Sequence, residues 1–273
     1  MKNINVKAVW ILIVPLLISC SSADFKEWQL EAVVGLEGIG IVGLELSEQE
    51  DFFWISDGNN NMLLKSSMDG EIIEQVEVMS RPMHLSLRDG ALYVAEYGAD
   101  RIIRVEGEHL ISVPLPQAPD APSGVDTDGE RVAVADFYNH RIIIWNDLED
   151  LTFGNEGNGP GQFHYPTQVR FYNENLYVAD AYNHRIQVFD KGLDFIKSIG
   201  EGDGMNATTG LFVDGSGIYA TDFENSRLLI YNHRGELMQI ISENLDKPTA
   251  VIHRDGKLYV ANFRGEFISI YRL

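Results

Sequence analysis

Short apolar runs recur along most of the chain, and turn-forming dipeptides separate them. Asp-Gly pairs stand between apolar runs at positions 89–90, 128–129 and 255–256. Asp-Gly between apolar segments is a strong hairpin signal, because both central residues of such a turn take positive φ. No helical periodicity longer than a turn or two occurs after residue 24, so the pattern predicts an all-β chain.

One polar motif ends a predicted strand in every repeated unit. The motif closes with an acid or an amide at Asp57, Glu96, Asp136, Asp180, Asp222 and Asn262. The spacings between these residues are 39, 40, 44, 42 and 40 positions. Each unit holds four predicted strands, and units of about forty residues with this content are typical of β-propeller blades. The chain is therefore expected to form six blades.

The two ends of the repeated region complement each other. The last unit stops after its third strand, Phe267–Tyr271, and lacks a fourth. The strand-like segment Trp28–Val34 precedes the first unit and has no partner of its own. We expect this segment to close the last blade, because an open stack of repeats would need polar caps at both ends. The expected fold is an all-β, six-bladed β-propeller of four-stranded antiparallel blades over residues 27–273.

The loop after the acid is nearly identical in two units. Tyr-Asn-His-Arg occupies positions 138–141 and again 182–185. In four units an arginine stands five positions after the acid: Arg101, Arg141, Arg185 and Arg227. A carboxylate can pair with such an arginine and accept loop N–H groups, which tightens the turn. Because catalysis usually needs one unique constellation, we interpret the recurring loop as scaffold.

Two segments, Val178–Asp190 and the glycine-rich linker Phe153–Phe163, resemble the NHL-repeat family of six-bladed propellers. The resemblance covers residues 27–273 and is closest in the third and fourth units. In this topology the linkers between blades, the polar loops and the start of each innermost strand share one face around the central channel. This face is called the axial face below.

Candidate functional residues are those that break the repeat beside the channel. The position twelve residues before the acid is small in three units, but it holds Glu45, His84 and Gln168 in the others. Glu45 and His84 come from adjacent blades, so they can bind a cation, act as an acid–base pair or hold a polar ligand. The alternative is a hydrogen-bonded plug of the channel with ordered water.

The axial face is also expected to carry aromatic and basic side chains from the loops. Such residues on one surface suit contact with a protein, a peptide or a glycan. We expect Tyr138 and Tyr182 to be exposed, whereas packing between blades is favoured for the aromatic residues at the first position of four loops: Tyr97, Phe137, Phe223 and Phe263. His164 and Arg264 are further candidates on this face.

The N-terminus resembles an export signal. Lys2 and Lys7 precede an apolar run over residues 8–18, which is too short to cross a bilayer as a helix and is typical of a signal peptide. The only cysteine follows in Leu-Ile-Ser-Cys20, which resembles the bacterial lipobox, where the cysteine is acylated. The alternative is a buried cysteine behind an ordinary signal.

On this basis we expect residues 1–19 to be a lipoprotein signal peptide and residues 20–26 a lipidated tether. Several acyl chains on Cys20 give stable membrane attachment. Ser21 after the cysteine resembles lipoproteins that stay in the outer membrane of cells with two membranes. For such a cell we expect an exported bacterial lipoprotein in that membrane, on the periplasmic or the surface side.

Acidic residues outnumber basic ones by 41 to 21, which gives a net charge of −20. Removal of residues 1–19 takes away two lysines and no acid, so the mature charge is −22. A surface of this charge repels phosphate backbones and anionic head groups. We therefore expect no nucleic-acid partner, and membrane contact through the lipid anchor only.

Three related propeller families bear on a catalytic function. Phe52–Asp57 resembles the first blade of calcium-dependent lactonases, which use one Glu, two Asn and one Asp, but Ser123 and threonines stand in the matching places here. Amidating lyases of the NHL type hold zinc with three His. In this chain only His84 and His164 lie in plausible positions, without a clear third. RNA-binding NHL modules use a basic face, which the charge of this chain contradicts.

The leading expectation is a non-catalytic monomer, anchored by lipid and without a cofactor, that binds a protein, a peptide or a polar ligand on its axial face. The alternative is a metal-dependent hydrolase or lyase with calcium or zinc in the channel, centred on Glu45 and His84.

Overall fold

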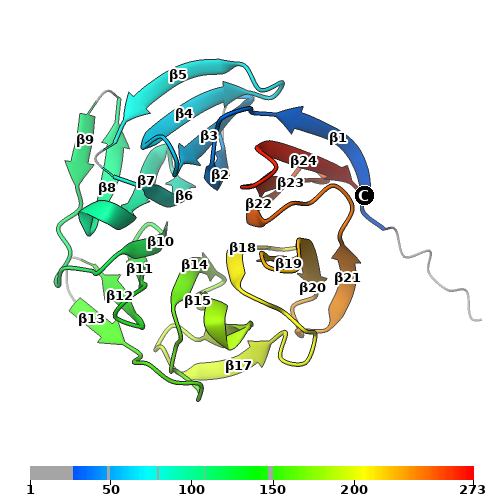
Figure 1. Ribbon diagram of the computed structural model, residues 1–273. Coiled ribbons are helices and arrows are strands. Elements are labelled where there is room, and N and C mark those ends of the chain that lie inside the picture. Colours follow the sequence, from blue (N-terminus) through cyan, green and yellow to red (C-terminus); the bar gives the residue numbers. More distant parts are fainter. Residues whose placement is uncertain (1–26, 48–49, 79, 108, 147–149) are drawn as a thin grey trace, which may run out of the picture.

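The structure is a computed structural model that describes residues 27–47, 50–78, 80–107, 109–146 and 150–273. These residues form six four-stranded antiparallel sheets, which are arranged radially around a central axis (Figure 1). The predicted six-bladed, all-β propeller is confirmed. No helix within the described residues is long and apolar enough to cross a membrane. Cys20 and the predicted signal peptide and tether lie outside the described part of the chain.

The blades follow one another in chain order, and each runs from an innermost to an outermost strand. Blades 1 to 3 are β2 (Ile41–Leu46), β3 (Phe52–Asp57), β4 (Met62–Ser67) and β5 (Ile72–Glu77); β6 (Pro82–Arg88), β7 (Ala91–Glu96), β8 (Arg101–Glu106) and β9 (His109–Ser112); and β10 (Pro122–Thr127), β11 (Val132–Asp136), β12 (Arg141–Trp145) and β13 (Asp150–Phe153). Blades 4 and 5 are β14 (Pro166–Tyr172), β15 (Asn175–Asp180), β16 (Arg185–Phe189) and β17 (Phe195–Ile199); and β18 (Thr208–Asp214), β19 (Gly217–Asp222), β20 (Arg227–Tyr231) and β21 (Leu237–Ile241).

Blade 6 combines the two ends of the chain. It contains β22 (Pro248–Arg254), β23 (Lys257–Asn262), β24 (Phe267–Arg272) and, as its outermost strand, β1 (Gln29–Gly35). The pairing of β1 with β24 runs from Gln29↔Arg272 to Gly35↔Phe267, and the two strands lie side by side in Figure 1. The predicted closure of the last blade by the N-terminal strand is confirmed.

The hydrophobic core lies between neighbouring blades. Second strands such as β11 are buried along their whole length, because a blade covers each of their two faces. The outermost strand β21 is instead mostly exposed. At the closure of the ring, Phe53 of blade 1 meets Tyr259 of blade 6 edge to face, with ring centroids 5.4 Å apart. The hydrophobic core is therefore continuous across the closure of the ring.

Strand direction sorts the connections onto two faces. Each innermost strand starts where the second strand of its blade ends, so the linkers and the polar loops share the axial face. The hairpins that join first to second strands and third to fourth strands lie on the opposite face, called the hairpin face below. Strand β1 begins on the hairpin face, because it is antiparallel to β24, which ends there.

Candidate functional site

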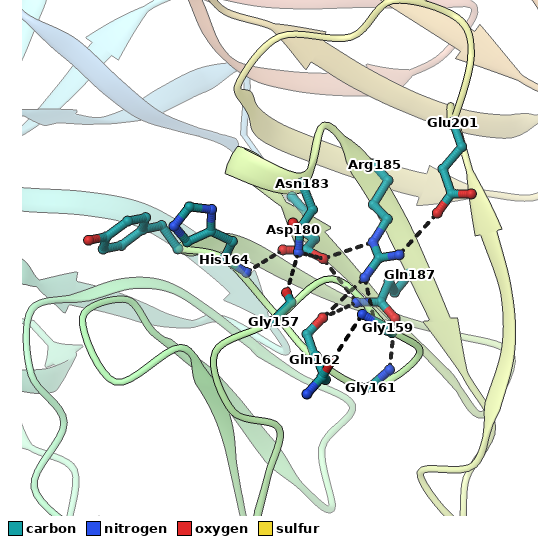
Figure 2. A network of polar contacts seen from close by, with 12 residues as sticks. Gly157, Gly159, Gly161, Gln162, His164, Asp180, Asn183, Arg185, Gln187 and Glu201 are labelled. Carbon is teal, nitrogen blue, oxygen red and sulfur yellow. Dashed lines mark hydrogen bonds and ion pairs between the residues drawn. The ribbon is translucent and has the colours of Figure 1, made fainter.

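The polar loop of blade 4 is a closed hydrogen-bond network (Figure 2). The buried carboxylate of Asp180 accepts the backbone N–H of His164 at 2.7 Å. It also accepts side-chain N–H groups of Asn183 and Gln187, each at 2.9 Å. The Nε atom of Arg185 lies 2.9 Å from the same carboxylate. Saturation of a buried carboxylate by neutral donors and one guanidinium is the signature of a structural group.

Arg185 connects this network to the glycine-rich linker. Its guanidinium donates to the carbonyl oxygens of Gly159 and Gln162, at 2.8 and 3.2 Å, and pairs with Glu201 at 3.0 Å. The linker that carried part of the family resemblance is therefore fixed against the loop. Linker and loop together form one rigid part of the axial face.

The acid–arginine pair recurs in three other blades, as predicted. The N–O distances are 2.5 to 2.6 Å for Glu96–Arg101, Asp136–Arg141 and Asp222–Arg227. Because four blades use the pair in the same way, a structural role is enough to explain why the acid and the arginine recur, and no catalytic role is needed.

The residue before the arginine connects each blade to the next. His140 and His184 have left-handed backbones, with φ of 52° and 56°. Their Nδ1 atoms accept the backbone N–H groups of Tyr165 and Ala207 in the following linkers, at 3.1 and 3.3 Å. The same left-handed conformation occurs in the other blades at Asn61, Asp100, Ser226 and Glu266. The histidines of the repeated motif are therefore connectors, with one ring nitrogen already engaged.

A second set of connections joins the starts of the innermost strands. Four hydroxyl groups each donate to a backbone carbonyl of the next blade at 2.8 to 3.0 Å: those of Ser123, Thr167, Thr209 and Thr249. In blade 1 the position holds Val42, and the Ser56 hydroxyl bonds the carbonyl of Met83 instead. These hydroxyl groups hold the ring together and are poorly suited to ligate a cation.

Glu45 does not occupy the position that its spacing from Asp57 indicated. In blades 3 and 4 the residue twelve positions before the acid, Gly124 or Gln168, pairs with the residue directly before the acid. In blade 1 this place belongs to Gly43, and Glu45 lies two residues further along the strand. The hairpin of blade 1 is two residues longer than those of blades 3 and 4, so counting back from the acid misplaces Glu45.

The predicted equivalence of Glu45 and His84 is therefore wrong. Glu45 lies at the level of Asp126 and Arg170, toward the hairpin face, because all three pair with the residue three positions before the acid of their blade. In blade 2 the residue at this level is Ser86, and His84 lies two residues nearer the axial end of the strand. The two residues thus belong to different ends of the channel.

Arg170 crosses the channel and closes it. Its Nη2 atom lies 2.6 Å from Oε1 of Glu45 on the opposite side of the ring, and its Nη1 atom lies 3.5 Å from Oδ1 of Asp126. Its Nε donates to the carbonyl of Leu211 at 3.1 Å. Asp126 in turn accepts the Ser86 hydroxyl at 2.6 Å. Side chains and backbone from five blades form this plug, so the alternative of a hydrogen-bonded plug describes this part of the channel.

Burial shifts the titration of the residues around the plug. It lowers the pKa of His84 from 6.5 to about 3, and the charge of Arg170 acts in the same direction, so the imidazole is neutral at physiological pH. Burial also raises the pKa of the Glu45 carboxyl, against the opposing effect of Arg170. Gln168 is 1% exposed, and its Oε1 atom has no hydrogen-bond partner among the described residues.

A cavity of about 250 Å³ opens on the axial face, and it is called the axial cavity. Side chains of the innermost strands form its floor: Val42, Met83, His84, Thr167, Thr209 and Thr249. Its wall includes Phe137, Phe223 and Phe263, which directly follow the acid of their blades. Phe137 packs against Tyr97 of the neighbouring blade, as predicted, but all three phenylalanines also line the cavity.

Seven aromatic rings extend the cavity wall over blades 2 to 4. They form the aromatic crescent, with 4.4 to 6.1 Å between the centroids of neighbouring rings: Tyr97, Phe137, Tyr138, His140, His164, Tyr165 and Tyr182. Arg81 lies over the ring of Tyr97, 5.0 Å from its centroid. Tyr138 and Tyr182 are 50% and 53% exposed, which confirms the exposure predicted for them.

The remaining candidates lie in different places. His164 belongs to the aromatic crescent, between His140 and Tyr182. Arg264 is exposed on blade 6 beside Phe263 and does not line the axial cavity.

The described residues contain no group of three or more His, Cys, Asp or Glu side chains that could hold a metal ion. Glu45 is engaged by Arg170, and the threonines that replace amides donate to backbone carbonyls. The ligand sets implied by the resemblance to lactonases and amidating lyases are therefore not assembled in this part of the chain.

Sequence reasoning missed Arg170 and the cavity beside it. This second cavity, of about 310 Å³, opens on the hairpin face and is called the hairpin-face cavity. The sequence pattern that could have predicted them lies two residues further along each innermost strand, where the six blades differ most. These positions hold Glu45, Ser86, Asp126, Arg170, Phe212 and Ile252.

The family model of the NHL repeat matches residues 163–189, which include the polar loop of blade 4. No curated protein sequence matches the chain significantly.

Solved structures share the fold at low sequence identity. Virginiamycin B lyase from Staphylococcus aureus is 15% identical with a TM-score of 0.67, over 90% of this chain and 100% of that one. A streptogramin B lyase is 16% identical with a TM-score of 0.67, over 90% and 87% of the two chains. A chain of a mitotic checkpoint complex is 14% identical with a TM-score of 0.68, over 100% and 99%. At these identities the similarity shows the fold alone: the chain is a six-bladed β-propeller, and its residues 163–189 match the NHL repeat.

Proposed function

We propose that the protein is a non-catalytic binding module that holds a protein or peptide partner on its axial face. The observation that carries the proposal is the aromatic crescent beside the axial cavity. Tyrosine, tryptophan and arginine dominate the energetic centres of protein interfaces, where they fill well-packed and desolvated contacts. Tyr138 and Tyr182 leave half of their surface to solvent, and Arg81 stands at the edge of the crescent.

The axial cavity suits an inserted side chain of such a partner. Its volume of about 250 Å³ is below the range of roughly 300 to 1,000 Å³ that is usual for small-molecule pockets. Val42, Met83 and the three phenylalanines make most of its lining apolar, and the threonine hydroxyls on its floor already donate to backbone carbonyls. An apolar or aromatic side chain flanked by backbone is the expected occupant, and a polar ligand is the less favoured one.

The proposal includes attachment to a membrane through Cys20. The described chain begins on the hairpin face, where Trp28 packs against Tyr219 and His253 with ring centroids 6.5 and 5.3 Å apart. A tether over residues 20–26 spans at most about 25 Å. An anchor at this point would turn the hairpin face toward the membrane and leave the axial face free for a partner.

The binding proposal is tested by replacing both exposed tyrosines of the crescent, Tyr138→Ala together with Tyr182→Ala. We expect the affinity for a partner captured from the native host to fall by at least about tenfold, because truncated interface tyrosines cost of the order of 1 to 2 kcal/mol each. The affinity is measured by titration of the purified partner, and thermal unfolding of the variant checks that the fold is kept.

Phe195→Ala is the matched control, because Phe195 is an exposed aromatic residue on the outer strand of blade 4, away from the axial face. A partner that binds the double variant and the control equally well would contradict the proposal.

The anchor is tested separately by Cys20→Ser. We expect this variant to lack the mass of the acyl chains and to leave the membrane fraction, while Ser21→Ala stays in it. Membrane association that survives Cys20→Ser would contradict lipid attachment without affecting the binding proposal.

The alternative remains a metal-dependent hydrolase or lyase. Its support is the fold shared with the streptogramin lyases and the position of the neutral His84 on the floor of the axial cavity. Metal analysis of the purified protein distinguishes the two functions. Stoichiometric calcium or zinc that is lost on Glu45→Ala or His84→Ala would favour the enzyme and contradict a binding-only role.

A further inference from the structure

The hairpin-face cavity is built by all six innermost strands. Its volume of about 310 Å³ lies within the range of pockets that accept a small molecule. The plug formed by Arg170 separates it from the axial cavity, so a ligand on this face would not reach the axial face through the channel.

The floor of this cavity is rigid. Arg170 is held by Glu45, Asp126 and the Leu211 carbonyl, and the Asp126 carboxylate also accepts the backbone N–H of Phe171 at 2.7 Å. Pairing on several sides fixes the guanidinium in one orientation, because each change of rotamer would break charge-assisted bonds. The floor is therefore preorganised.

Two arginines on the rim retain free donors. Arg88 donates its Nε to the Thr127 carbonyl at 3.2 Å, and Arg254 donates an Nη1 to the Ser47 carbonyl. Within the described residues, neither forms an ion pair with a carboxylate. Both guanidinium groups therefore keep N–H groups for a ligand. They come from blades 2 and 6, on the two sides of blade 1, which carries Glu45.

Each acidic residue of the cavity has a partner, and Glu45 pairs with Arg170. Asp126 binds Ser86, Phe171 and Arg170. Asp214 lies 2.5 Å from Nδ1 of His253 and accepts backbone N–H groups of its own turn. The groups of the cavity that remain available for hydrogen bonds are therefore mainly N–H donors, although the whole chain carries a net charge of −20. Its apolar lining includes Leu87, Phe212 and Ile252.

We propose that the hairpin-face cavity binds a small organic anion, whose carboxylate or other anionic head is held by Arg88 and Arg254 and whose apolar part lies against Phe212 and Leu87. Planar guanidinium groups match carboxylates with two parallel hydrogen bonds. This site is independent of the axial face and of the partner proposed for it.

The test uses benzoate as the probe, with inorganic phosphate as an anion that lacks an apolar part and benzyl alcohol as a neutral molecule of similar shape. Isothermal titration of the purified propeller is expected to show saturable benzoate binding that is tighter than that of either other probe. Arg88→Ala and Arg254→Ala are each expected to weaken benzoate binding by at least about tenfold, since each removes a charge-assisted contact.

Arg234→Ala is the matched control, because Arg234 is an exposed arginine in a turn of the same face that does not line the cavity. Thermal unfolding of all three variants shows whether they remain folded, and Tyr182→Ala on the axial face should bind benzoate as the unmodified protein does. The proposal is overturned by absent or non-saturable benzoate binding, by binding that persists without Arg88 and Arg254, or by phosphate or benzyl alcohol binding as tightly as benzoate.

Discussion

The two mouths of one channel have opposite chemistry, although the same six strands build both. The axial mouth is lined by phenylalanines, aliphatic side chains and threonines, and the aromatic crescent extends from it. The mouth on the hairpin face is lined by arginines, carboxylates and a histidine that alternate around the ring. The plug of Arg170, Glu45 and Asp126 separates them.

This difference follows from the contacts that join neighbouring innermost strands at each end of the channel. At the axial end, hydroxyl groups of four innermost strands donate to backbone carbonyls of the next blade, so these positions repeat and the exposed residues of the loops supply the variation. Toward the hairpin face the strands diverge in sequence, and side chains that fill the channel replace the repeated contacts. Function is therefore expected in the axial loops on one face and in the strand ends on the other.

The largest effect is expected from Arg170→Met, which removes the cation between two buried carboxylates. Glu45 and Asp126 would remain in the channel without it, and loss of one partner from a buried ion pair costs about 3 to 5 kcal/mol of unfolding free energy. Urea unfolding at pH 7 measures the loss. Arg234→Met, at an exposed position, should change stability by no more than about 0.5 kcal/mol. Equal stability of the two variants would show that the plug does not hold the strands together.

Gly210→Ala tests the narrow part of the channel above the plug. An added Cβ would lie 2.3 Å from the Thr249 carbonyl oxygen and 2.8 Å from the Cα of Ala250, and both are backbone atoms. We expect a loss of about 1 to 3 kcal/mol, because the strands must separate to admit the methyl group. Gly35→Ala is the control, since nothing lies within 4 Å of its Cβ position. Thermal unfolding compares the two, and a harmless Gly210→Ala would contradict close contact between these strands.

His84→Gln tests the desolvated position between the two mouths. The pKa of His84 falls from 6.5 to about 3 in the folded protein. Between these pH values the imidazole is protonated in the unfolded chain and neutral in the folded one. The contribution of His84 to the free energy of unfolding is complete above about pH 6.5. It declines toward pH 3, by at most about 1.4 kcal/mol per pH unit. Unfolding free energy measured at a series of pH values should depend less on pH below 6.5 in His84→Gln. The exposed His109→Gln should follow the unmodified protein. Parallel curves for His84→Gln and the unmodified protein would show that His84 is protonated when folded.

The smallest effect is expected from Thr209→Val, which removes one hydroxyl from the axial end. The Thr209 hydroxyl donates to the Pro248 carbonyl at 3.0 Å and lies 2.9 Å from that of Thr221. We expect a loss of about 1 kcal/mol, the usual net contribution of one such bond. Urea unfolding measures it, and benzoate binding at the other mouth should be unchanged. A gain in stability would indicate that the hydroxyl ring costs more to desolvate than it contributes.

Repetition made much of the scaffold predictable. The acid and the arginine of each loop lie five positions apart in the chain, so pairs such as Asp180–Arg185 could be inferred from local spacing. The missing fourth strand and the unpaired segment near Trp28 likewise predicted the pairing of β1 with β24. The exposure of Tyr138 and Tyr182 followed from their place in the loop.

The candidate site was less predictable, because it depends on residues that the repeat does not align. Two additional residues in the hairpin of blade 1 moved Glu45 away from the level of His84. Packing between blades was the favoured expectation for Phe137, Phe223 and Phe263, yet these side chains also line the axial cavity.

The sequence by itself determined the number of blades, their closure and the role of the polar loops, because each of these rests on contacts that recur at fixed spacing. Only the tertiary structure decided which side chains meet across the channel. Glu45 and Arg170 are 125 positions apart and belong to opposite blades, so nothing in their local sequence relates them. They become neighbours only because six twisted sheets close into a ring and direct the ends of their innermost strands toward one axis.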